Sequence, residues 1–161
     1  MIDIAPCLWF DGQAEEAARF YCSVFPRSEI GAIMRCGEGM RYPPGAVLFV
    51  EFTLDGQRFQ ALNGGPQFNF SEAISLSVPC ADQAEVDRYW EALTADGGVP
   101  GPCSWLKDKF GVSWQIVPRS VSRMQRDGSP AQIRRMMDAL MKMSKLDVAV
   151  LEAAYAGQGA D

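Results

Sequence analysis

Histidine is absent from this chain of 161 residues. Histidine is the side chain that most often serves as a general base near neutral pH, and it is a common metal ligand. Its absence excludes catalysis through a histidine base. Any chemistry that the chain carries out must use carboxylates, thiols, amides or lysine.

Long apolar runs and an excess of basic residues are missing as well. No apolar run approaches the roughly 20 residues that a membrane-spanning helix needs, and Met1–Ile4 lacks the basic start of a secretory signal. The 20 acidic residues outnumber the 15 basic ones, whereas a broad nucleic-acid-binding face needs clustered basic residues. We therefore expect a cytoplasmic protein that binds neither membrane nor nucleic acid.

Paired cysteine motifs are also lacking. No CxxC pair occurs among the five cysteines, which are Cys7, Cys22, Cys36, Cys80 and Cys103. Their odd number fits reduced thiols better than a disulfide framework. With no histidine to lower a thiol pKa, a cysteine nucleophile is not expected. We interpret most of them as small buried residues, with Cys7 and Cys80 at the ends of corresponding strands.

Two short stretches of the chain repeat one pattern. Phe59–Leu62 and Trp114–Val117 each consist of an aromatic residue, a glutamine and two apolar residues, just after a turn signal. The segments before them are alike too, since Gln-Ala-Glu leads to a basic residue and two aromatic ones at 13–21 and again at 83–90. The repeat predicts a duplicated fold in which the two glutamines occupy equivalent positions.

Apolar periodicity predicts a similar order of elements in both halves. The first half is expected to form a strand, a helix and three strands, at Ile4–Phe10, Ala14–Phe25, Glu29–Cys36, Val47–Leu54 and Gln57–Asn63. The second half is expected to form a strand, a helix and two further strands, at Ala73–Val78, Ala81–Ala95, Cys103–Lys107 and Val112–Val117. A remaining strand looks weak or missing around Val99–Pro102. Asp55-Gly56 is a strong signal for a two-residue hairpin.

Past Pro118 the pattern turns helical. Ser129 is placed to cap a helix, with Pro130 at its first position and Gln132 closing a capping box. An apolar stripe follows at helical spacing, made of Ile133, Met136, Met137, Leu140 and Met141. We interpret this stripe as packing on the protein's own sheet, and a subunit contact is the alternative. A last short helix is predicted over Asp147–Tyr155.

Three phrases of the chain carry a resemblance to a known family. They are Leu8–Ala17, with the sequence LWFDGQAEEA, Ala61–Pro66, with ALNGGP, and Trp105–Pro118, with WLKDKFGVSWQIVP. On these phrases the chain resembles the PhnB-like family, whose members are often labelled 3-demethylubiquinone-9 3-methyltransferases. This family is a branch of the glyoxalase/bleomycin resistance/extradiol dioxygenase superfamily, also called the vicinal oxygen chelate superfamily.

The resemblance implies an α+β fold of duplicated β-α-β-β-β units that form curved mixed sheets around a cleft, with a C-terminal helical extension. Residues 1–118 would form the superfamily domain from repeats at about 1–64 and 70–118. Residues 119–161 would form the extension. The resemblance also implies a homodimer, because relatives commonly share clefts or exchange units between subunits.

In metalloenzymes of the superfamily, each half supplies ligands from two strands. By motif, these positions fall near Pro6, near Ala73 or Ser75, and on Gln60 and Gln115. Glutamine offers a neutral carbonyl, whereas Zn²⁺, Ni²⁺ and Fe²⁺ favour imidazole, thiolate or carboxylate. We therefore expect neither the usual metal centre nor another cofactor.

The leading hypothesis is a metal-independent protein that binds a small molecule, with Gln60, Gln115, Ser75 and Glu51 lining the cleft. The alternative for the two carboxamides is that they bond each other or backbone. Glu51 lies on a mostly apolar strand face and is a weak candidate for a pocket base. Alternatively, Glu51 is a solvated charge, or it pairs with Arg35 in the neighbouring strand.

The sequence leaves three other functions open. A lyase or isomerase of the same superfamily would use a metal, or Glu51 as its base. Methyl transfer, as the family label says, is disfavoured, because no glycine-rich GxGxG turn follows a strand. A protein-interaction module would use the methionine-rich helix.

Overall fold

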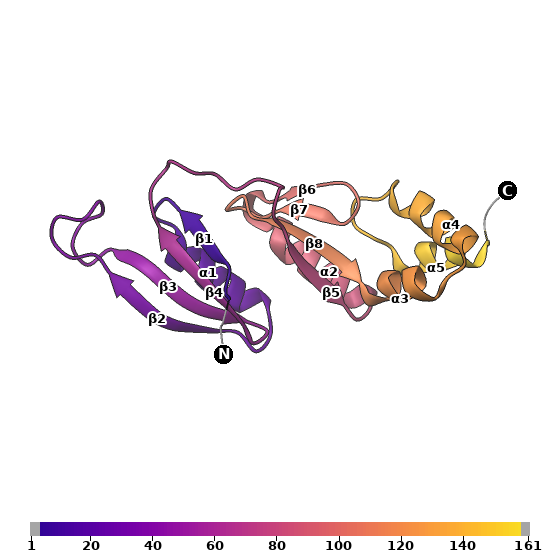
Figure 1. Ribbon diagram of the computed structural model, residues 1–161, viewed down its shortest axis with the longest axis horizontal. Helices are drawn as coiled ribbons and strands as arrows, with labels where there is room; N and C mark the ends of the chain where they lie inside the picture. Colours follow the sequence, from indigo (N-terminus) through magenta and orange to yellow (C-terminus); the bar gives the residue numbers. More distant parts are fainter. Residues whose placement is uncertain (1–3, 159–161) are drawn as a thin grey trace. The chain divides into compact units, whose positions relative to one another are not determined.

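The computed structural model of the chain describes residues 4–158. The chain forms two compact units, which divide between Phe70 and Ser71. Each unit contains a four-stranded mixed sheet with a helix on one of its faces, and the second unit also contains the C-terminal helices (Figure 1). This is the α+β architecture that the sequence predicts.

The first unit consists of β1 (Cys7–Phe10), α1 (Ala14–Val24), β2 (Glu29–Arg35), β3 (Val47–Leu54) and β4 (Gln57–Asn63). Its strands lie in the order β1-β4-β3-β2. The β1 strand runs parallel to β4, and the other neighbours are antiparallel.

The second unit begins with β5 (Leu76–Cys80), α2 (Gln83–Thr94), the 3₁₀ helix η1 (Ala95–Gly97), β6 (Val99–Pro100), β7 (Trp105–Lys107) and β8 (Ser113–Pro118). Its strand order, β5-β8-β7-β6, repeats that of the first unit, again with one parallel pair, β5 with β8. The predicted duplication is confirmed. The predicted first strand at Ala73–Val78 was placed too early, because residues 72–74 form a turn and bend. The weak strand does form, but it has only two residues, and prolines at positions 100 and 102 remove backbone donors.

Small residues bring α1 close to its sheet. Ala14, Ala17, Ala18 and Tyr21 are fully buried on one face of the helix, and they pack against the inward side chains of β3 and β4. Asn63 at the end of β4 secures the start of the helix, because its Oδ1 accepts the Ala14 N–H at 2.9 Å. Its Nδ2 donates to the Val47 carbonyl at 2.9 Å. This buried amide therefore joins the helix and two strands.

The Asp55-Gly56 turn joins β3 to β4 as the sequence predicts. Both residues have positive φ angles, 49° and 81°. Two consecutive left-handed residues define the type I′ turn whose twist suits a two-residue hairpin. Glycine at the second position adopts this conformation without steric cost.

Three helices follow β8: α3 (Arg119–Asp127), α4 (Pro130–Leu140) and α5 (Val148–Ala156). The predicted capping box at the start of α4 is confirmed, with bonds in both directions between Ser129 and Gln132. The expectation that the apolar stripe of α4 packs on a sheet was wrong in its main contact. Three residues of the stripe, Met136, Met137 and Leu140, pack against the neighbouring helices, whereas Met141 is 63% exposed. The buried residues of this cluster are Val121, Met124, Met136, Leu140, Leu146 and Leu151.

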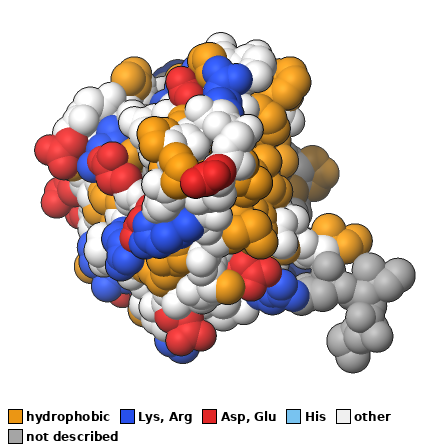
Figure 2. All heavy atoms as spheres, turned by 90° about the vertical axis from the view of Figure 1, so that its left-hand side faces the viewer, with side chains coloured by type: hydrophobic (Ala, Val, Ile, Leu, Met, Phe, Trp, Pro, Cys, Tyr) orange, Lys and Arg blue, Asp and Glu red, His pale blue; other side chains and the backbone are white. Residues whose placement is uncertain are grey.

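The surface carries charge of both signs. On the face that Figure 2 shows, acidic and basic side chains lie in small groups between hydrophobic ones. Among residues 4–158, none of the helices has the length and apolar character that crossing a membrane requires.

Candidate functional site

Each sheet has one face that α1 or α2 covers and one face that these helices leave open. On β4 the buried residues Phe59, Ala61 and Asn63 point toward α1, so the half-buried Gln60 points to the opposite, open face. The register places Gln60 between Cys7 on β1 and Glu51 on β3. A thiol, a carboxamide and a carboxylate therefore form one row across the first sheet.

The second sheet carries the equivalent row. Gln115 on β8 lies between Ser77 on β5 and Trp105 on β7. The strand of Gln60, β4, lies between a parallel strand, β1, and an antiparallel strand, β3, and the strand of Gln115, β8, lies between β5 and β7 in the same orientations. The predicted equivalence of the two glutamines is therefore confirmed at the level of strand register.

The two glutamines differ in their hydrogen bonds. Gln115 Nε2 donates to Ser75 Oγ at 2.8 Å in a partly buried position, so the structure brings together two of the predicted site residues. The Gln60 carboxamide forms no side-chain hydrogen bond within residues 4–158. It is the less constrained of the two groups.

Glu51 lies on the open face but is not enclosed. Its side chain is 41% exposed, and its Oε1 lies 3.7 Å from Arg58 Nη2. The predicted alternative of a pair with Arg35 is wrong in its partner, because the register sets Arg35 beside Val47, four residues before Glu51, and its Nη1 donates to the Gly45 carbonyl. This geometry describes a solvated carboxylate beside an arginine.

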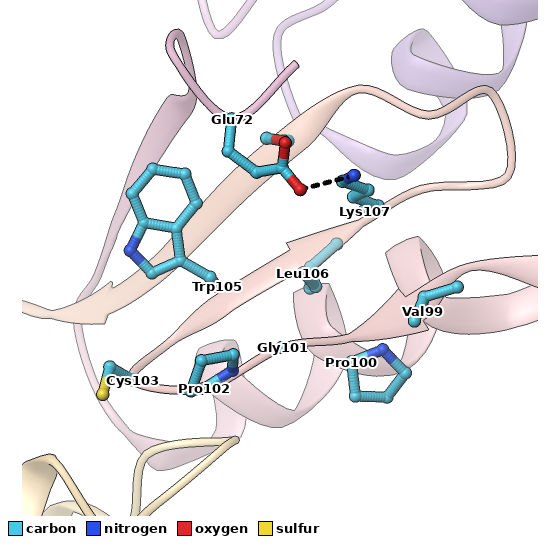
Figure 3. Close-up of a pocket in the computed structure, with 10 residues that line it drawn as sticks. Glu72, Val99, Pro100, Gly101, Pro102, Cys103, Trp105, Leu106 and Lys107 are labelled. Carbon is cyan, nitrogen blue, oxygen red and sulfur yellow. Dashed lines mark ion pairs between the residues drawn. The ribbon is translucent and has the colours of Figure 1, made fainter. Parts of the chain in front are cut away.

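A pocket of about 720 Å³ lies on the second unit along β6 and β7. Its walls are mostly apolar and include Val99, Pro100, Pro102, Trp105 and Leu106. One ion pair crosses it, between Lys107 Nζ and Glu72 Oε1 at 2.6 Å. Figure 3 shows Glu72 and Lys107 pointing toward one another, with the Trp105 indole on the other side of Glu72.

The pocket also contains a buried hydroxyl group. Ser113 at the start of β8 is 1% exposed and lines the pocket. Its Oγ has no hydrogen-bond partner among the described residues. A buried polar atom without a partner is uncommon in folded proteins, and it calls for an explanation.

Sequence reasoning missed the charged and hydroxyl groups of this pocket. Lys107, Trp105 and Ser113 share the face of Gln115, because cross-strand register pairs Lys107 with Ser113 and Trp105 with Gln115. Alternation along the two predicted strands was the signal that could have found them. Glu72 lies in an irregular segment, where no periodicity points to it.

A buried carboxylate nearby has a structural role. Asp108 is 3% exposed. Its Oδ1 accepts the N–H groups of Phe110 and Val112, and its Oδ2 accepts the Trp114 indole N–H at 2.8 Å. The side chain thus fixes the turn between β7 and β8 and holds Trp114 in the core.

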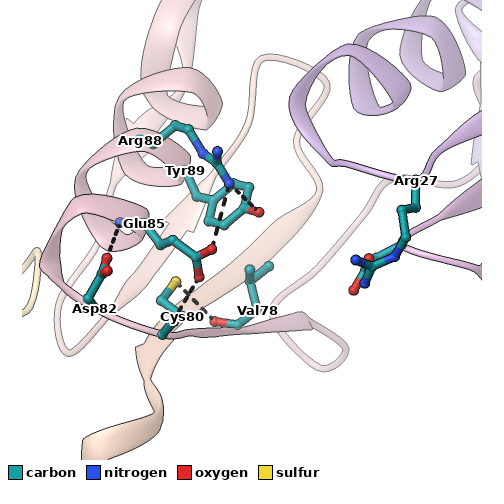
Figure 4. Close-up of polar contacts among 9 residues, drawn as sticks. Arg27, Val78, Cys80, Asp82, Glu85, Arg88 and Tyr89 are labelled. Atoms are coloured by element: carbon teal, nitrogen blue, oxygen red, sulfur yellow. Dashed lines mark hydrogen bonds and ion pairs between the residues drawn. The ribbon is translucent and has the colours of Figure 1, made fainter.

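The expectation that most of the cysteines are buried was wrong, because Cys36 and Cys80 are buried, Cys22 and Cys103 are partly exposed and Cys7 is exposed. Cys80 is fully buried, and burial, with a smaller contribution from Glu85, raises its pKa to about 12. Figure 4 shows its Sγ beside the Val78 carbonyl and near the polar contacts that cap α2. Cys7 is exposed on the open face, although partial burial of its sulfur also raises its pKa. Cys7 and Cys80 lie at ends of the corresponding strands β1 and β5, as expected. They lie at opposite ends of these strands, and the register makes Ser77 the counterpart of Cys7.

The donor groups beside the two glutamines do not fit a metal centre of the superfamily's kind. The positions expected by motif, near Pro6 and near Ala73 or Ser75, do lie beside the glutamines, because the Gln60 N–H donates to the Pro6 carbonyl and Gln115 Nε2 donates to Ser75 Oγ. The strand register adds Cys7 and Ser77 as cross-strand partners. Within residues 4–158, no three side chains of the histidine, cysteine, aspartate and glutamate types lie together in a way that could hold a metal ion. Cys7 and Glu51 supply one thiol and one carboxylate beside Gln60, but the carboxamides and the Ser77 hydroxyl that share the two rows with them are weak ligands for Zn²⁺, Ni²⁺ or Fe²⁺.

Comparison with known proteins identifies the family. The family model described as 3-demethylubiquinone-9 3-methyltransferase matches residues 2–117. The chain belongs to this family. A Bacillus cereus PhnB protein of known structure is 38% identical over 73% of this chain and 99% of its own, with a TM-score of 0.65. None of the curated proteins matches the chain.

More distant structures share the fold. A Pseudomonas aeruginosa protein is 20% identical over 73% of this chain and 98% of its own, with a TM-score of 0.60. The fosfomycin resistance protein FosX of Listeria monocytogenes is 14% identical over 73% of this chain and 94% of its own, with a TM-score of 0.52. The fold is that of the glyoxalase/bleomycin resistance superfamily, as the sequence resemblance implies.

Proposed function

We propose that the protein binds a small organic molecule on the open faces of its sheets without using a metal ion. The pocket on the second unit is the observation that carries this proposal. Its volume of about 720 Å³ lies within the range of roughly 300–1,000 Å³ that is typical of ligand sites. Apolar walls with a few convergent polar groups are the composition that such sites share.

The four ligand-binding residues predicted from the sequence lie on these open faces but outside the lining of the pocket. We propose them as further polar contacts, each pair on its own sheet. Gln115 and Ser75 form the polar part of the second face, linked by their 2.8 Å hydrogen bond. Gln60 and Glu51 form the equivalent polar part of the first face, in one cross-strand row. A carboxamide both donates and accepts hydrogen bonds, so it can orient a polar ligand group in either role.

The description of the family names methyl transfer, and the loops of this chain favour binding over that reaction. The links from β1 to α1 and from β5 to α2 are short, and neither contains the glycine-rich turn that holds a nucleotide-like cofactor in most methyltransferases. Calorimetric titration with S-adenosylmethionine tests this point. Saturable binding of that cofactor would favour methyl transfer instead.

Fluorescence titration with N-phenyl-1-naphthylamine, a neutral apolar probe, tests the proposed pocket. Val99, which is 59% exposed on the pocket wall, is changed to aspartate. We expect Val99→Asp to weaken probe binding by about tenfold, because it places a charge on an apolar wall. The matched control is Val150→Asp, since Val150 on α5 is 49% exposed and does not line this pocket. Equal probe binding by both variants would refute the pocket as the ligand site.

Native mass spectrometry of the purified protein provides a complementary test. We expect a homodimer that retains an organic mass, and this mass should be lost in Val99→Asp but kept in Val150→Asp. A bound divalent metal at unit stoichiometry would contradict the metal-free proposal.

A further inference from the structure

The ion pair in the pocket has an unusual setting for a surface salt bridge. Ten described residues line the pocket, and Lys107 is the only basic one among them. Its partner Glu72 is the only acidic one. The two charges therefore face each other inside a site whose other walls are mostly apolar. Glu72 and Lys107 are thus the charged lining residues that a ligand in the pocket would meet.

The two partners are held very differently. Lys107 lies on β7, where it pairs with Ser113 of β8 and with Val99 of β6. Glu72 lies outside any strand, in the irregular segment before β5, and its side chain is 62% exposed. The lysine is part of the sheet, whereas the glutamate reaches it from a segment without regular backbone hydrogen bonds. Glu72 is the partner that can move away.

The hydroxyl group of Ser113 gives a second, independent indication of a ligand. This side chain is 1% exposed and lines the same pocket, and its Oγ lacks a partner among the described residues. Because it pairs across the sheet with Lys107, an acidic group bound to the lysine would lie within reach of the hydroxyl. An oxyanion has several acceptor sites, so it can accept bonds from both groups.

The Trp105 indole completes the site. It lines the pocket on the same face as Lys107. Figure 3 shows its ring and the lysine on either side of Glu72. An aromatic wall beside a lone cation suits a planar apolar body with one acidic group.

We propose that Glu72 is an internal stand-in for the acidic group of the ligand, and that the pocket takes a planar apolar acid whose carboxylate or sulfonate displaces Glu72 from Lys107. This inference rests on the proposed function, because it names the ligand class of the same pocket. Glu72 then acts as a built-in competitor. Removing its charge strengthens acid binding, and removing the charge of Lys107 weakens it.

The electrostatics of the pair agree with this role. The hydrogen bond from Lys107 is the main cause that lowers the pKa of the Glu72 carboxyl. The lysine thus stabilises a carboxylate at this position. A carboxylate supplied by a ligand would meet the same cation.

The test compares two fluorescent probes that differ in one charge. N-phenyl-1-naphthylamine is neutral, and 1-anilinonaphthalene-8-sulfonate carries the same ring system with a sulfonate. We expect Glu72→Gln to bind the sulfonate about three- to tenfold more tightly than the wild-type protein does, and Lys107→Gln to bind it about tenfold more weakly. The affinity for the neutral probe should change less than twofold in either variant.

A control variant separates a local effect from a change in overall charge. Glu38→Gln makes the same chemical change at an exposed residue outside the pocket, and it should leave both affinities unchanged. The inference is overturned if Glu72→Gln binds the sulfonate no more tightly than Glu38→Gln does. It is overturned equally if the loss in Lys107→Gln is the same for both probes.

The outcomes distinguish this inference from the proposed function. If Val99→Asp weakens binding of the neutral probe but Glu72→Gln leaves the affinity for the sulfonate unchanged, the pocket stands as the ligand site and the proposal of an acidic ligand is rejected. Failure of both probes to bind any variant removes both proposals.

Discussion

Replacing the buried Asp108 with alanine should sharply destabilise the second unit. The carboxylate accepts three hydrogen bonds, and two of the donors, the Val112 N–H and the Trp114 indole N–H, belong to residues that are 4% and 2% exposed. A buried donor left without a partner costs about 1–3 kcal/mol. Two such donors predict a loss of about 2–6 kcal/mol in the free energy of unfolding.

Urea denaturation followed by far-ultraviolet circular dichroism and tryptophan fluorescence measures this loss. The matched control is Asp138→Ala, because Asp138 is 68% exposed and lies 3.9 Å from Arg134 in an i,i+4 pair. Such a pair is worth about 0.5 kcal/mol or less. Asp108→Asn should fall between the two variants, since it keeps one acceptor oxygen but presents an amide donor to the Trp114 indole. A loss below about 1 kcal/mol in Asp108→Ala would refute the assignment of these bonds as structural.

Three further predictions concern other buried groups. Asn63→Ala should lower the free energy of unfolding by about 2–4 kcal/mol, because it leaves the Ala14 N–H and the Val47 carbonyl without their partner. Urea denaturation measures this loss, and a loss no larger than that of an exposed substitution would contradict the role of Asn63. In the same assay, Met136→Ala should lower the free energy of unfolding by about 2–5 kcal/mol and Met141→Ala by less than about 1 kcal/mol, because their exposed fractions are 0% and 63%. Equal losses in the two variants would show that Met136 does not belong to the helical core. Cys80 should resist alkylation at pH 8 in the folded protein, because a pKa of about 12 leaves almost no thiolate. The pKa of the Cys80 thiol is raised above its value in the unfolded chain, so its contribution to the free energy of unfolding is fully present below about pH 9. Above that pH the contribution falls by up to about 1.4 kcal/mol per pH unit, because only the unfolded chain loses the proton. An alkaline slope that stays the same in Cys80→Ala would contradict this prediction.

Strand and turn chemistry were readable from the sequence because they depend on near neighbours. The Asp55-Gly56 hairpin, the capping box of α4 and the alternation along β3 all follow from backbone preferences within a few residues. The duplication was readable because each copy carries its own aromatic-glutamine pattern. The sequence pattern alone therefore assigns Gln60 and Gln115 to equivalent strands, as the register confirms.

Long-range pairing was not readable in the same way. The parallel strands β1 and β4 are separated by about fifty positions, and a shift of one residue in their register exchanges the two faces. The sequence located the positions beside the two glutamines only approximately, near Pro6 and near Ala73 or Ser75, and the register assigns Cys7 and Ser77 as their strand partners. Helix packing against the covered face selects the register, because it must bury the apolar set.

The sequence by itself determined the α+β class, the repeated order of elements, the family resemblance and the positions of both glutamines. Tertiary structure alone decided that Glu72 reaches Lys107, that the buried Ser113 hydroxyl has no hydrogen-bond partner among residues 4–158, and that Met136 and Met137 of α4 pack on neighbouring helices. Periodicity describes which way a residue points along its own element. Which partner a charge or an apolar stripe meets depends on the contacts of distant segments, and no local pattern records them.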